Sequence, residues 1–63
     1  MRKTKLFTRT ELEHMSIHEL IQLFYDVLRE LNTTTNNNTK NILNKNLILI
    51  NQVIANKRWE NER

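Results

Sequence analysis

Residues 16–31 read SIHELIQLFYDVLREL, and this stretch decides the fold of the chain. Its first four residues form a capping box, in which the Ser16 hydroxyl accepts from the amide three residues on and Glu19 reaches back to the amide of Ser16. We therefore predict a helix over about 17–31. Its apolar residues recur at alternating steps of three and four and form one packing stripe. The stripe consists of Ile17, Leu20, Ile21, Phe24, Val27, Leu28 and Leu31.

The segment ahead of this helix combines a second cap with a cluster of positive charge. Residues 8–11, TRTE, repeat the capping-box pattern and predict a short helical turn over 11–14. Before the first acid, the chain has four cations in what we interpret as a flexible basic arm, residues 1–9. These cations are Arg2, Lys3, Lys5 and Arg9.

A polar stretch separates the first helix from a second apolar segment. Residues 32–41, NTTTNNNTKN, have no apolar side chain and consist of types that prefer turns to helix interiors. We predict a hairpin loop there and a helix over about 40–58, although a short buried strand at 47–50 is a competing interpretation. The second helix has two adjacent stripes, Leu43, Leu47, Ile50 and Ile54, and Ile42, Leu49 and Val53.

These elements predict an all-α fold: one domain, residues 1–63, forming an antiparallel two-helix hairpin with a short N-terminal helical turn. A chain of this length buries little of its surface, and without Cys it has no disulfide to stabilise it. We therefore expect the hairpin to depend on a partner, which its second apolar stripe on 40–58 would contact. A homodimer, another protein or an RNA groove would each suit that stripe.

The charge favours an anionic partner. Ten Lys and Arg against seven Asp and Glu give a net charge of +3, and basic residues concentrate near the two termini. No apolar run approaches the length of a membrane span, and the basic start lacks the apolar core of a signal peptide. We expect a protein inside a cell or organelle. The abundance of Asn, Lys and Ile is typical of an AT-rich genome.

The residues disfavour enzymatic chemistry. His14 and His18 are four residues apart, but the cap at Ser16 separates them, so we expect surface histidines and no metal site. No catalytic constellation accompanies them, and a chain without glycine has no glycine-rich phosphate loop. We predict a non-enzymatic protein without a cofactor.

Near the C-terminus, Lys57, Arg58 and Trp59 place two cations beside an aromatic ring. This combination suits a phosphate backbone with a base stacked next to it. A tryptophan at a helix end more often closes the bottom of a hairpin, and we favour packing against Leu12 or Leu20.

The spacing Glu11-Leu12, Ser16, Glu19-Leu20 resembles the ELxxxSxxEL opening of the large-subunit ribosomal protein L-twenty-nine family, and residues 46–54 align without a gap to the end of that family's second helix. The resemblance implies a helical hairpin that binds large-subunit rRNA near the polypeptide exit tunnel, beside ribosomal protein L-twenty-three. Together with the AT-rich composition, the resemblance leads us to expect the chain in the ribosome of a plastid, a mitochondrion or a low-GC bacterium. The cations that we expect on rRNA are Arg2, Lys3, Lys5, Arg9, Lys40, Lys45, Lys57 and Arg58.

Two other classes of function fit the same hairpin. One is a small dimeric regulator, such as a phage, plasmid or bacterial inhibitor, that binds another protein through the second helix. The other is an independent nucleic-acid binder that acts as a dimer.

The second helix departs from the L-twenty-nine pattern, which is richer in basic residues. In this chain only Lys40 and Lys45 precede Lys57, and many of the other positions are Asn.

Overall fold

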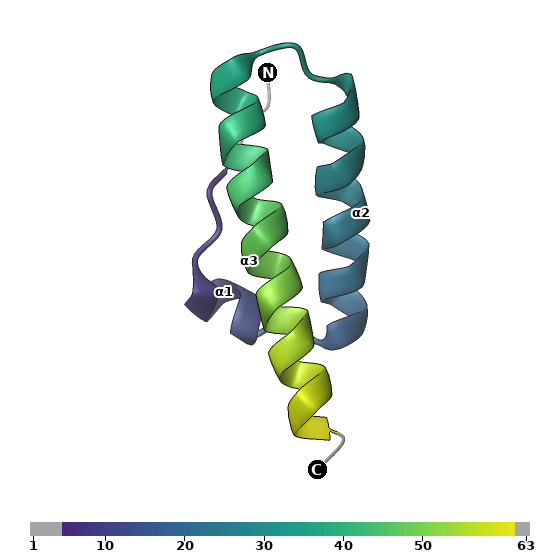
Figure 1. The fold of residues 1–63 in the computed structure, drawn as a ribbon. Coiled ribbons are helices and arrows are strands. Elements are labelled where there is room, and N and C mark those ends of the chain that lie inside the picture. Colours follow the sequence, from purple (N-terminus) through teal and green to yellow (C-terminus); the bar gives the residue numbers. More distant parts are fainter. Residues whose placement is uncertain (1–4, 62–63) are drawn as a thin grey trace.

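The computed structural model describes residues 5–61 and contains three helices in that range, with no strand. They are α1 (Arg9–Glu13), α2 (Ile17–Thr33) and α3 (Asn37–Asn61). Helices α2 and α3 form an antiparallel hairpin, and α1 lies against α3 near the open end of that hairpin (Figure 1). The predicted all-α hairpin with a short N-terminal helical turn is confirmed.

Both predicted capping boxes are present. The amide of Glu19 donates to the Ser16 hydroxyl at 3.1 Å, and the amide of Ser16 donates to the Glu19 carboxylate at 3.0 Å. The same reciprocal pair joins Thr8 and Glu11 at the start of α1, at 3.2 and 3.1 Å. Each box pairs backbone amides that have no partner within the helix, and so sets where the helix begins.

The hairpin loop is much shorter than predicted. Only residues 34–36 connect the helices, so the predicted loop over 32–41 and the helix over 40–58 are both wrong in their bounds. The side-chain oxygen of Asn36 accepts from the amides of Asn38 and Thr39, at 2.9 and 3.1 Å. This N-cap lets the polar Asn and Thr residues form the first turn of α3, where such residues cost little.

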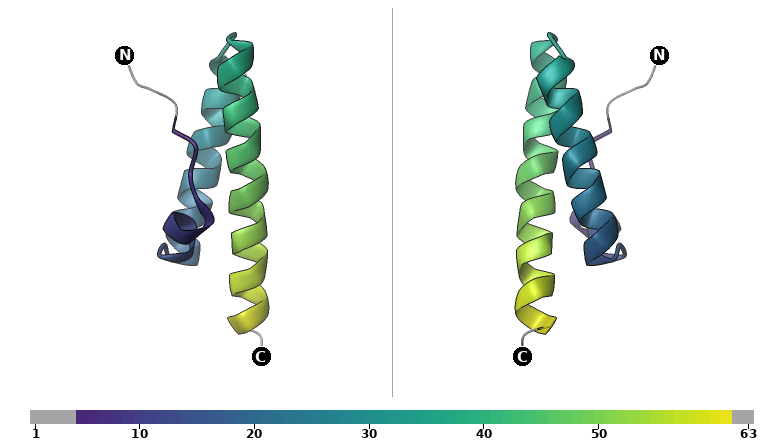
Figure 2. Two further views of the ribbon diagram at one scale, coloured as in Figure 1. Left: turned by 90° about the vertical axis from the view of Figure 1, so that its left-hand side faces the viewer. Right: turned by 90° about the vertical axis from the view of Figure 1, so that its right-hand side faces the viewer.

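The core lies where α2, α3 and α1 meet. Two of its residues come from the predicted stripe of α2, three from the two stripes of α3, and one from α1. Figure 2 shows α1 and the segment before it against the hairpin on one side. In the second stripe of α3, which we expected to bind a partner, Val53 is therefore buried within the chain and Leu49 packs against the core, while Ile42 stays partly exposed. The buried core residues are Leu12, Leu20, Val27, Leu43, Ile50 and Val53.

A buried asparagine in α3 holds the N-terminal segment in place. The side chain of Asn46, only 1% exposed, accepts from the amide of Phe7 at 2.9 Å and donates to the carbonyl of Lys5 at 2.7 Å. We call this pair of bonds the Asn46 clamp. The prediction of a flexible arm over residues 1–9 is thus wrong for residues 5–9, which are bound to α3 or belong to α1, while residues 1–4 lie outside the described part.

Candidate nucleic-acid interface

The two described cations of the basic arm are both paired with acids of α1. Lys5 forms an ion pair with Glu11, and its ammonium group also lies 5.3 Å from the centre of the Phe7 ring. The Lys5 bond, together with the backbone bond from Thr8, lowers the pKa of Glu11 below its ordinary value. Arg9 pairs with Glu13 at 3.3 Å. Partial neutralisation by these acids makes both cations weaker candidates for phosphate, and the predicted Arg2 and Lys3 lie outside the described residues.

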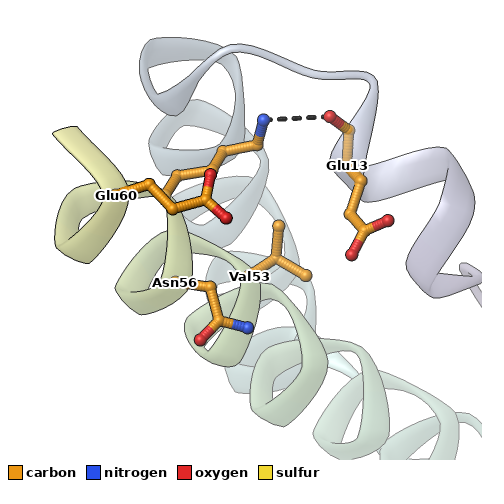
Figure 3. Close-up of a pocket in the computed structure, with 5 residues that line it drawn as sticks. Glu13, Val53, Asn56 and Glu60 are labelled. Carbon is orange, nitrogen blue, oxygen red and sulfur yellow. Dashed lines mark hydrogen bonds between the residues drawn. The ribbon is translucent and has the colours of Figure 1, made fainter.

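Lys57 serves the fold at the junction of α1 and α3. Its ammonium group donates to the backbone carbonyl of Glu13 at 2.9 Å, the bond drawn as a dashed line in Figure 3. A cation at this carbonyl also suits the negative C-terminal end of the short helix. The surrounding shallow pocket is lined in addition by Val53, Asn56 and Glu60. Lys57 therefore helps to hold α1, and its contact with RNA stays a prediction.

One side of α3 is open along its whole length. Alternating steps of four and three place six residues on one stripe of a helix, and all six are exposed. A parallel row of three exposed residues, each seven apart, flanks this stripe. Together we call the nine residues the outer face of α3: Asn41, Lys45, Ile48, Gln52, Ala55 and Trp59, with Asn44, Asn51 and Arg58.

The outer face contains two cations, four amides and three apolar residues, and no carboxylate. Helix α3 has four Lys and Arg and one acid, Glu60 near its end, whereas α2 has three acids and a single Arg. The net charge of the chain is therefore carried unevenly, with α3 positive and α2 negative. Within residues 5–61, Lys45 and Arg58 form no side-chain hydrogen bond or ion pair, and Lys40 is half-buried near the start of the same helix.

The structure places Trp59 differently from the expectation that it packs against Leu12 or Leu20. Its side chain is 66% exposed, whereas both leucines are fully buried by other residues. The reason is its register, because Trp59 lies on the outer face of α3, on the same exposed stripe as Ile48 and Ala55. In addition, α3 has 25 residues and α2 has 17, so the last turns of α3 project past the start of α2 (Figure 1). Within residues 5–61, the projecting end approaches only the end of α1 and the start of α2, on the side of Lys57 and Glu60.

A second open surface, which meets the outer face at Asn51, lies between the two long helices. A shallow groove there is lined by Ile21, Phe24 and Tyr25 of α2 and by Asn51 and Ile54 of α3. Tyr25 is 62% exposed, and its ring meets that of Phe24 edge to face, with 6.0 Å between their centres. The groove is mainly apolar, and it offers no charged group to a phosphate.

The described part of the chain offers few residues for metal binding and no span for a membrane. No three His, Asp or Glu side chains among residues 5–61 gather closely enough to hold a metal ion. None of the helices described is long and apolar enough to cross a membrane. Comparisons with protein-family models, curated proteins and solved structures found no match to this chain. What the residues do offer is an acid-free surface of cations and amides, which suits hydrogen bonding and charge pairing to a phosphate backbone.

Proposed function

We propose that this chain binds RNA through the outer face of α3, as a structural component of the large ribosomal subunit. The observation that carries the proposal is the composition of that face, in which Lys45 and Arg58 stand among amides with no carboxylate beside them. Cations supply attraction to phosphate, while Asn and Gln side chains donate hydrogen bonds to phosphate and base edges. An acid-free strip avoids the repulsion that a carboxylate would add.

The resemblance to the L-twenty-nine family supports the assignment to the ribosome. Its residues serve the fold here: Leu12 and Leu20 are core residues, and Ser16 and Glu19 form the cap of α2. The resemblance therefore bears on the architecture of the hairpin, and the RNA-binding part of the proposal depends on the outer face. In the proposed assembly the chain contacts large-subunit rRNA near the exit tunnel, beside ribosomal protein L-twenty-three.

The salt dependence of RNA binding tests the role of the outer face. In single-stranded RNA each phosphate contact contributes about 0.7 to the slope of log affinity against log salt. The double variant Lys45→Gln/Arg58→Gln should therefore lower that slope by about 1.4. The matched control is Arg9→Gln/Arg29→Gln, which removes the same charge from α1 and α2. Equal losses in both variants would mean that RNA responds only to net charge, and would overturn the outer face as the interface.

Cosedimentation tests the ribosomal assignment. The tagged chain, expressed in a low-GC bacterium, should sediment with large subunits and remain bound at moderate salt. Its absence from large subunits, with RNA binding intact, would leave an RNA-binding protein of another kind.

The groove between α2 and α3 favours a second candidate, a small regulator that dimerises or binds another protein. Exposed Ile21 and Tyr25 beside half-buried Phe24 form the kind of apolar surface that helix bundles bury between copies. Sedimentation equilibrium distinguishes the two functions. A concentration-dependent dimer that Tyr25→Ala dissociates, together with no affinity for RNA, would support the regulator and remove the ribosomal proposal.

A further inference from the structure

Trp59 is an aromatic side chain with an unusually open environment in a protein of this size. Packing normally buries most of a tryptophan, about 150–250 Å² of surface, yet two thirds of Trp59 is exposed to solvent. The residue one turn earlier on the same stripe is Ala55, whose side chain is too small to cover much of a neighbouring ring. The last turns of α3 project past the start of α2 (Figure 1), so neither α1 nor α2 covers two thirds of the Trp59 side chain.

The charges around the ring suit a nucleotide. Arg58 precedes Trp59 and is exposed, so a cation is available for the phosphate of a stacked base. The next residue, Glu60, lines the pocket on the α1 side together with Lys57, as Figure 3 shows. Glu60, the acid nearest to Trp59 in sequence, therefore lies on a different side of α3 from the outer face.

We infer that Trp59 is a stacking site for an unpaired RNA base, with Arg58 and Lys45 on the phosphates of the same strand; the inference depends on the proposed RNA-binding function. Lys45 lies thirteen residues before Arg58, or about 20 Å along the helix axis, a span that suits a short run of single-stranded RNA. Duplex RNA is excluded from this site because its bases are already stacked and its deep groove does not admit side chains.

The only tryptophan of the chain gives a direct readout. Titration with a ten-nucleotide oligoadenylate should quench the fluorescence of Trp59, whereas an RNA duplex of the same length should not. Trp59→Ala should weaken binding of the oligonucleotide about 5- to 150-fold, the range that stacking energies of about 1–3 kcal/mol represent. Trp59→Phe, which keeps an aromatic face, should recover much of the lost affinity.

Tyr25→Ala is the matched control, since Tyr25 is almost as exposed as Trp59 but lies in the groove and outside the outer face. It should leave the RNA affinity unchanged. The variants are compared after circular dichroism shows equal helix content. Binding of the oligonucleotide without quenching, and with equal affinity in Trp59→Ala, would overturn the stacking site while leaving the proposed function intact. No binding of any RNA by the original chain would overturn both.

Discussion

Replacing Asn46 by alanine tests how the N-terminal segment is held. The change removes both bonds of the Asn46 clamp, the one from the Phe7 amide and the one to the Lys5 carbonyl. Each such bond contributes about 0.5–1.5 kcal/mol net, and leaving its partner unpaired in a partly buried place adds to the cost. We expect Asn46→Ala to lower the free energy of unfolding by about 2–4 kcal/mol. A domain of 63 residues has a total of about 3–9 kcal/mol, so the loss is a large part of it.

Two measurements separate global from local effects. Urea denaturation, monitored by circular dichroism, gives the free energy of unfolding of the whole chain. The hydrogen-exchange rate of the Phe7 amide shows how firmly the N-terminal segment is held. In Asn46→Ala the Phe7 amide should exchange faster even under conditions in which the hairpin stays folded. This outcome is expected because the clamp joins the segment to α3 but does not lie between α2 and α3.

Asn44→Ala supplies the control, because it makes the same replacement two residues earlier in α3 at an exposed position. Alanine favours the helix equally at both sites, so the difference between the variants isolates the clamp. We expect Asn44→Ala to be neutral or slightly stabilising, with Phe7 exchange unchanged. Equal stability of the two variants, with equal exchange at Phe7, would refute the assignment of the clamp.

Three further predictions concern the core and the caps. Leu20→Ala should lower the free energy of unfolding in urea by about 2–5 kcal/mol, while Ile21→Ala, which is partly exposed, should lose much less; similar losses would contradict the assigned packing face. Asn36→Ala should cost about 0.5–2 kcal/mol in the same assay by removing the cap of α3, and no loss would argue against the three-residue turn. The hydrogen bond from the Ser16 amide lowers the pKa of the Glu19 carboxyl in the folded chain. The stability that this bond contributes is therefore complete above the ordinary glutamate pKa of about 4.3, and it is lost as the pH falls through the lower pKa of the folded state. Acid titration of stability should therefore show a smaller decline in Glu19→Gln than in the original chain, and identical declines would remove Glu19 from this role.

Features set by neighbouring residues were predictable from the sequence. The capping boxes at Thr8 and Ser16 each depend on a partner three residues away, and both starts of helices were predicted within two residues or better. The loop was predicted too long because Asn and Thr were taken as turn residues. Asn and Thr are equally suited to the first turn of a capped helix, and here the Asn36 side chain caps α3 by accepting from the amides of Asn38 and Thr39.

Features that depend on distant residues were missed. Asn46 was taken as one more Asn of a biased composition, although its position completes the apolar stripe of Ile42, Leu49 and Val53 at steps of four and three. That register was the signal that could have identified it as a buried residue. Trp59 is exposed because it lies on the outer face of α3, which no other element of residues 5–61 covers.

The clamp also determines when different parts of this chain can fold. A three-residue turn lets α2 and α3 pair through contacts that are close in sequence. The bonds of Asn46 instead reach Phe7, which is 39 positions away, and Lys5, which is 41 positions away. During synthesis, the backbone groups of Lys5 and Phe7 therefore lack their Asn46 partner until the first ten residues of α3 have emerged. A chaperone or protease that acts on the nascent chain would find this segment unattached to α3 throughout that interval.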